Sequence, residues 1–310
     1  MKKIKFFLRL LISAVLIYLL FQKISISDLH EMISRIGWFY FFICVFIYLI
    51  SQIVSSIRWQ MILKTMKEDV SVFVLVVVYL IGMFANLFLP SIIGGDVLKV
   101  YLLRKRFSLQ RVADSIIMER YNGLFALCAI SVVGAAYNKD WRIILILLSV
   151  FFLVAFSPFF LKKITTLSSS LGKKKAVNSF LQDMGAFSHD KKALFLVTLL
   201  SFVVQFIVIG IIIVIGRRIG IEASIFYYFI FVPLIILLSF LPISLNGIGI
   251  REWAFVFFFS TVGASKVEAI SLSLSFFFIT VVASLFGGLS YLLWKEDGYS
   301  KKGKQDDNIP

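Results

Sequence analysis

The chain has 310 residues, of which 60% are hydrophobic and 16% are charged, and its formal net charge is +15. Soluble domains carry about 25% charged residues, so this composition excludes a soluble protein. In a soluble protein such a charge would suggest nucleic-acid binding. In a membrane protein, however, Lys and Arg gather in the cytoplasmic loops. The composition therefore predicts an integral membrane protein and argues against a nucleic-acid partner.

Six continuous apolar stretches are long enough to cross a bilayer, which takes about 20 apolar residues in a helix. They are 4–21, 38–57, 112–137, 143–161, 194–215 and 267–294. The first stretch follows a basic start, but no small-residue cleavage site comes after it. We interpret it as an uncleaved span and not as a signal peptide.

Two further apolar regions, 70–103 and 224–262, are interrupted by proline, glycine and charged residues. A single crossing by the first would place the basic segments 104–111 and 163–193 outside, against the positive-inside rule. If each region enters and leaves on one side, most of the 32 Lys and Arg lie inside, Arg58 among them. We expect an all-α polytopic membrane protein with about six full transmembrane helices, two re-entrant helical hairpins and cytoplasmic termini. Hydropathy alone counts the two interrupted regions as spans and gives about eight.

The order span, span, hairpin, span occurs twice, and "LPSIIGGD" in the first hairpin resembles "LPISLNGIG" in the second. Three crossings per half invert the second half relative to the first, as in many transporters. We expect an inverted repeat with residues 1–137 as its first half and 138–294 as its second. The tail, 295–310, is predicted to be disordered.

The interruptions are interpreted as hairpin tips around a binding site. Glycine permits tight turns and the close approach of a ligand, and the start of each returning helix offers free N–H groups to an anion such as a lipid phosphate. The expected tip residues are Asn86, Pro90, Gly94, Gly95, Pro242, Asn246, Gly247 and Gly249.

Six charged residues fall at membrane depth, where a charge costs about 3 kcal/mol and is functional by default. They are the bases Lys99, Arg120 and Arg251 and the acids Asp96, Glu119 and Glu252. The bases are candidates for lipid phosphate, and arginine is favoured because its guanidinium binds phosphate bidentately. The acids would position the bases or carry a proton. The alternative is that acids and bases simply pair and hold the two halves together.

The segment 163–193 is predicted to be a basic cytoplasmic loop. Within it, Val177, Phe180, Leu181 and Met184 follow helical spacing. This pattern indicates an amphipathic helix that lies on the inner leaflet, with lysines facing anionic lipid.

Motifs for several enzyme classes are missing from the sequence. It has no P-loop, no zinc-protease HExxH, no dinucleotide fingerprint and no nucleophile elbow. The cysteines, Cys44 and Cys128, lack the spacing of a metal or redox site. We therefore expect no cofactor, no bound metal and no ATP-driven pump in this chain.

Three segments, "GGDVLKVYLL", "ERYNGLFAL" and "LPISLNGIGIREWAFVFF", resemble the membrane family named for the transmembrane region of lysylphosphatidylglycerol synthase. The resemblance covers nearly the whole chain. Where the family usually has Gly-Glu and then Arg, this chain has Asp96 and Lys99, and the family's Glu-Arg pair matches Glu119 and Arg120. The resemblance implies the handling of a lipid or polyprenyl lipid in a prokaryotic plasma membrane.

The resemblance implies a flippase-like translocase that moves or binds an anionic phospholipid, an aminoacyl-phospholipid or a polyprenyl-linked glycolipid. The alternatives are a membrane enzyme or glycosyltransferase accessory that acts on a lipid-linked substrate, and a scaffold without transport. Full-length synthases add a soluble aminoacyl transferase domain, so we expect no lysyltransferase activity here. Membrane lipids are the expected partners, and a lipid-modifying enzyme or a second copy of the chain are the candidate protein partners.

Overall fold

The computed structural model describes residues 34–88, 93–137, 174–239 and 249–294. Within these ranges every regular element is an α-helix. The expected spans 4–21 and 143–161 and the tail 295–310 lie outside them.

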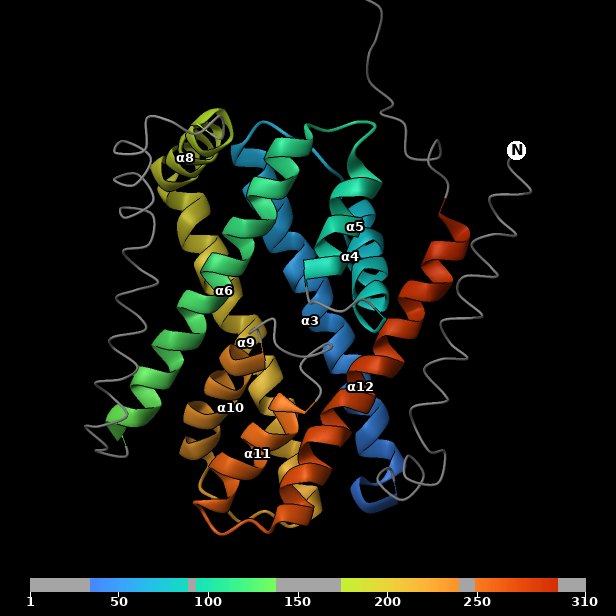
Figure 1. Ribbon diagram of the computed structural model, residues 1–310, viewed down its shortest axis with the longest axis vertical. Coiled ribbons are helices and arrows are strands. Elements are labelled where there is room, and N and C mark those ends of the chain that lie inside the picture. Colours follow the sequence, from blue (N-terminus) through green and yellow to red (C-terminus); the bar gives the residue numbers. More distant parts are fainter. Residues whose placement is uncertain (1–33, 89–92, 138–173, 240–248, 295–310) are drawn as a thin grey trace, which may run out of the picture.

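The described helices agree closely with the apolar stretches of the sequence (Figure 1). In chain order they are α3 (Trp38–Thr65), α4 (Val72–Asn86), α5 (Ile93–Leu103), α6 (Leu109–Tyr137), α8 (Lys174–His189), α9 (Lys191–Ile219), α10 (Ile225–Ser239), α11 (Ile250–Ser260) and α12 (Lys266–Leu293). Among them α3, α6, α9 and α12 are long and apolar enough to cross a membrane. The prediction of an all-α polytopic membrane protein is therefore confirmed.

Polar residues at the ends of the apolar runs fix where the long helices start and stop. The Asp190 carboxylate accepts a hydrogen bond from the Ala193 N–H at the start of α9, and Gly220 ends that helix with a φ of 105°. Ser265 and Glu268 form a reciprocal pair of side-chain to backbone hydrogen bonds at the start of α12. Such caps satisfy backbone groups that have no partner within the helix.

The described helices repeat one succession of lengths. Helices α3 to α6 have 28, 15, 11 and 29 residues, and α9 to α12 have 29, 15, 11 and 28. The contacts between the two groups of helices correspond as well. Helix α4 packs on α12, the last helix of the other group, and α10 likewise packs on α6. The first helices of the two groups, α3 and α9, pack on each other. Figure 1 shows α4 and α5 together in the upper half of the view and α10 and α11 in the lower half. Each pair of short helices therefore packs against a long helix of the other group.

Helix α3 is longer than the predicted span 38–57, because it continues to Thr65. Arg58, which the sequence had assigned to the cytoplasmic charges, is consequently buried inside the bundle. This assignment was wrong because the apolar run was taken as the limit of the helix. A polar helical turn can remain inside a membrane protein when other helices supply its partners.

The predicted basic loop 163–193 contains helix α8 and the first residues of α9. The amphipathic helix is confirmed, but part of its apolar face packs on protein and not on the leaflet. Phe180, Met184 and Phe187 pack in one cluster with side chains of α3, α6 and α9. The helix therefore caps the end of the bundle where α9 begins (Figure 1).

Glycines allow the closest approaches between helices. A Cβ at Gly287 of α12 would overlap the backbone of Leu80 in α4, and a Cβ at Gly95 of α5 would overlap the Gly82 carbonyl and Asn86 of α4. Small residues at such contacts are characteristic of membrane helices, whose association depends on close packing. Helix α4 is thus held tightly between α5 and α12.

Substitution of Gly287 by alanine should destabilise the protein, because the new methyl group pushes α12 away from the α4 backbone. Overpacking of this kind costs about 1–3 kcal/mol. The matched control is Gly210→Ala in α9, where a Cβ meets nothing within 4 Å. Thermal unfolding in detergent should show a lower midpoint for Gly287→Ala alone, and equal midpoints would contradict the close α4–α12 contact.

Candidate functional site

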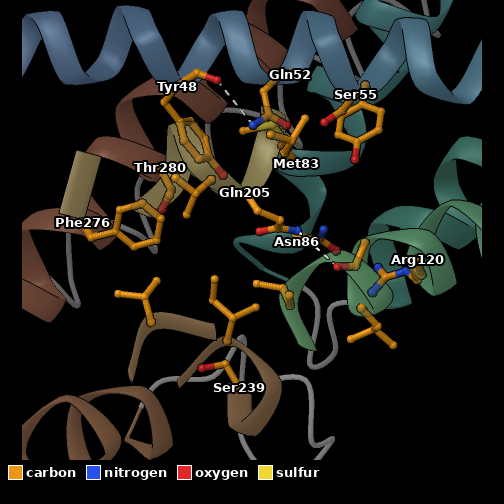
Figure 2. A pocket seen from close by; sticks show the side chains of 18 of the residues that line it. Tyr48, Gln52, Ser55, Met83, Asn86, Arg120, Gln205, Ser239, Phe276 and Thr280 are labelled. Atoms are coloured by element: carbon orange, nitrogen blue, oxygen red, sulfur yellow. Dashed lines mark hydrogen bonds between the residues drawn. The ribbon is translucent and has the colours of Figure 1, made fainter. Parts of the chain in front are cut away.

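A pocket of about 370 Å³ lies between the two groups of helices, and α3 to α6 and α9 to α12 all contribute side chains to its wall (Figure 2). Its charged lining residues are Arg58, Asp96, Lys99, Glu119, Arg120 and Arg251. Five of the six charges singled out in the sequence thus line one pocket, and the sixth, Glu252, is bonded to Arg251.

Asp96 is the centre of the first charged cluster. Its carboxylate accepts a hydrogen bond from the Arg120 guanidinium, and the Lys99 ammonium lies 3.4 Å away. The same ammonium lies over the ring of Tyr79, 3.5 Å from its centroid, and 5.5 Å from the ring of Trp59. Because a cation over an aromatic face is further stabilised when it is shielded from water, Lys99 is firmly held.

Glu119 forms the second cluster. It accepts hydrogen bonds from Arg58 at 2.8 Å and from the Tyr79 hydroxyl at 3.1 Å. Arg58 also donates to Ser201 of α9 at 3.1 Å, so this cluster joins three long helices. The Nε atom of Arg58 is buried and has no hydrogen-bond partner among the residues that the structure describes. Sequence reasoning missed this residue, although the polar run "SSIRWQ" at the end of an apolar helix signals a helix face turned toward protein.

Arg251 and Glu252 form the third cluster at the start of α11. They pair at 2.9 Å, and Ser273 of α12 donates to Glu252 at 3.0 Å. The Arg251 guanidinium lies 4.8 Å from the centroid of the Phe277 ring. These contacts attach the start of α11 to α12.

The starts of the two short helices differ from the expected anion sites. The Gly95 N–H donates to the Asn86 Oδ1 at 2.7 Å, and the Gly249 N–H donates to Glu252 at 2.5 Å. Protein side chains therefore already occupy these two N–H groups. Guanidinium groups are the better candidates for an anion.

The tip residues that fall in the described ranges are only partly at turns. Asn86 is the last residue of α4, and Gly94 and Gly95 lie in the first turn of α5. Gly249 precedes α11 with a φ of 90°, a conformation that favours glycine. Pro90, Pro242, Asn246 and Gly247 lie outside the described residues.

The four bases differ in how far they reach into open space. Side-chain exposure is 29% for Arg120 and 12% for Arg251, but only 6% for both Lys99 and Arg58. Arg120 and Arg251, from opposite helix groups, are therefore the bases best placed to meet a ligand.

The three clusters contain four bases and three acids, so together they carry one positive charge in excess when all are ionised. In the part of the chain that the structure describes, no three His, Cys, Asp or Glu side chains converge on a common point. The charged groups of the pocket are thus arranged as acid–base pairs with one base in excess.

The Arg58–Glu119 pair should be essential for stability. Arg58→Met leaves Glu119 buried without its cation, which costs about 3–5 kcal/mol. The double variant Arg58→Met/Glu119→Gln should recover most of this loss, because no uncompensated charge remains. Arg111→Met, which removes a half-exposed partner of Glu68, serves as the control and should cost less than about 1 kcal/mol. Thermal unfolding in detergent measures the stability of all three variants. An Arg58→Met variant as stable as the wild type would refute the buried pair.

Comparison with known proteins agrees with the resemblance seen in the three motifs. No curated protein and no solved structure shows a significant match to the chain. Residues 6–288, however, match the family described as the lysylphosphatidylglycerol synthase transmembrane region. This match covers most of the chain, so the protein belongs to the lysylphosphatidylglycerol synthase transmembrane region family.

Proposed function

We propose that this protein is a flippase-like lipid translocase that binds the phosphate-bearing headgroup of a membrane lipid in the central pocket. The observation that carries the proposal is the meeting of Arg120 and Arg251, from opposite helix groups, in one pocket. The family description links the chain to a lipid-related membrane function. Charged side chains at membrane depth mark the paths of polar groups through the bilayer.

Ion pairs at the pocket would be exchanged when the lipid enters. A guanidinium has five N–H donors and binds phosphate and carboxylate in the same fork geometry. A phosphate could therefore take the place of Asp96 on Arg120 and of Glu252 on Arg251. Asp96 would remain neutralised by Lys99 during this exchange, because the two groups lie 3.4 Å apart.

Translocation, and not binding alone, is supported by the repeated succession of helix lengths and by the matched contacts of α4 with α12 and α10 with α6. Two inverted halves with a site between them can expose that site to each side in turn by rocking. In this proposal α4–α5 and α10–α11 are the two re-entrant hairpins, one from each side of a prokaryotic plasma membrane.

A scaffold without transport is the second candidate, because each of the three acids is ion-paired. In a scaffold, the arginines would contribute to stability and would have no effect on bound lipid. In a translocase, their removal changes lipid binding more than folding. The two functions are therefore separated by measuring lipid and stability on the same variants.

Arg120→Gln and Arg251→Gln should each lower the amount of anionic lipid that co-purifies with the protein about tenfold, the value of one charge-assisted hydrogen bond. Native mass spectrometry measures the bound lipid, and dithionite quenching of a fluorescent phospholipid in proteoliposomes measures its movement. Arg111→Gln, outside the pocket, should match the wild type. Unchanged lipid and movement, together with a lowered unfolding temperature, would favour the scaffold.

The hairpin topology predicts that the α3–α4 and α5–α6 connections face the same side, and Figure 1 shows both at one end of the bundle. In a background lacking the buried Cys44 and Cys128, Asp69→Cys and Arg106→Cys should react with an impermeant maleimide only from the cytoplasmic side. Ser224→Cys, at the α9–α10 connection, should react from outside. Labelling of Asp69→Cys and Arg106→Cys from opposite sides would exclude a re-entrant α4–α5 pair.

A further inference from the structure

The pocket has a second polar surface that carries no charge. Tyr48, Gln52 and Ser55 project into it from α3, and Gln205 projects from α9 (Figure 2). Gln52 and Ser55 are buried in the bundle and still line the pocket. An uncharged amide or hydroxyl at such a position can form hydrogen bonds with a ligand without changing the charge of the pocket.

These uncharged groups retain hydrogen-bonding capacity toward the pocket. Gln52 uses its NH₂ group on the Ser51 hydroxyl at 2.9 Å, and Gln205 uses its NH₂ group on the Gly123 carbonyl at 3.5 Å. In these bonds both glutamines donate through their nitrogen atoms, so the bonds leave the Oε1 atoms unused, and the side chain of Tyr48 lines the same pocket. Each amide oxygen can accept, and the phenol can both donate and accept. This set suits a neutral hydroxyl group, which also donates and accepts.

The ring of Tyr48 is held in place, so that its phenol is a defined contact. Phe276 of α12 meets it edge-to-face, with 6.1 Å between ring centroids. Tyr48 and Arg251 both line the pocket. The uncharged surface is therefore adjacent to the arginine that would hold the phosphate.

The same pocket is unfavourable for a cationic headgroup. Its two carboxylates, Asp96 and Glu119, are each bonded to a base, and Glu252 beside it is bonded to Arg251. Among the described residues that line the pocket, no other acid is available. An ammonium group would meet an excess of positive charge, and like charges at close range repel.

We infer that the headgroup bound here carries a phosphate and neutral hydroxyl groups, as in a glycerol or a sugar, and that an aminoacylated, cationic headgroup is rejected. This inference rests on the proposed function and narrows its substrate. The pocket volume of about 370 Å³ is at the low end of ligand sites, which are about 300–1,000 Å³. It fits a headgroup without its acyl chains.

The test is competition between lipids with identical acyl chains, measured by native mass spectrometry on the full chain. The probes are phosphatidic acid, phosphatidylglycerol, phosphatidylinositol and lysyl-phosphatidylglycerol. The hydroxylated anionic lipids should bind at least about fivefold more tightly than phosphatidic acid, as expected for one or two neutral hydrogen bonds. Preference for phosphatidylglycerol would identify a glycerol headgroup, and preference for phosphatidylinositol a ring of hydroxyls. The inference would be overturned if lysyl-phosphatidylglycerol bound as tightly as phosphatidylglycerol or phosphatidylinositol. It would also be overturned if phosphatidic acid bound as tightly as these two lipids.

Variants of the uncharged surface give an independent readout. Tyr48→Phe and Gln52→Leu should weaken binding of the hydroxylated lipid about fivefold and leave phosphatidic acid unchanged. Tyr101→Phe, an exposed tyrosine outside the pocket, is the matched control. Equal losses for both lipids would show a merely structural role and contradict the inference.

The two levels of the proposal fail in different ways. If Arg120→Gln and Arg251→Gln retain every anionic lipid, the phosphate site itself is refuted. If they lose anionic lipid but the wild type does not distinguish hydroxylated from lysylated headgroups, only the narrower inference fails.

Discussion

The constraint on which this structure depends is that every charge inside the helix bundle needs a partner there. Lipid offers none, and an unpaired charge in a low-dielectric interior is unstable. Asp96 on α5, Glu119 on α6 and Glu252 on α11 each meet at least one base. Because a helix can turn only one face toward such a partner, the pairs fix the rotation of these helices. The pocket is the space left between the helix faces that carry these charge pairs.

Charge pairing of this kind requires the backbones to come close, and small residues provide for it. Gly82 of α4 leaves room for the stem of Lys99, since a Cβ there would lie 2.8 Å from the lysine Cε. Gly95, the third residue of the described α5, packs on the same turn of α4. Gly95, which the sequence suggests as a hairpin-tip residue, thus acts on helix packing, and the ammonium of Lys99 is buried because α4 has no side chain at Gly82.

The sequence predicts the helices and the charged residues better than it predicts their partners. Composition and hydropathy identify α3, α6, α9 and α12, and Asp96 and Arg120, singled out as isolated charges, both line the pocket. Arg58 is missed, because the end of an apolar run does not mark the end of a helix when another helix supplies a carboxylate. Part of the apolar face of α8 is misassigned, since an apolar stripe has the same sequence pattern whether it packs on lipid or on protein. Which residues pair depends on the tertiary structure, and the periodicity of the sequence does not predict it.

Because the site has one more base than it has acids, it favours an anion over a cation. Without an anion the three clusters hold net positive charge, which is costly at the centre of a membrane. A bound phosphate monoanion would bring the set to neutrality, so that a change in access moves no net charge in the loaded state. The empty state would retain the excess and face a larger barrier to the same change. In the proposed translocase, a site of this composition would couple reorientation to occupancy through electrostatics, and the uncharged wall formed by Tyr48, Gln52 and Gln205 would select among anions without altering that balance.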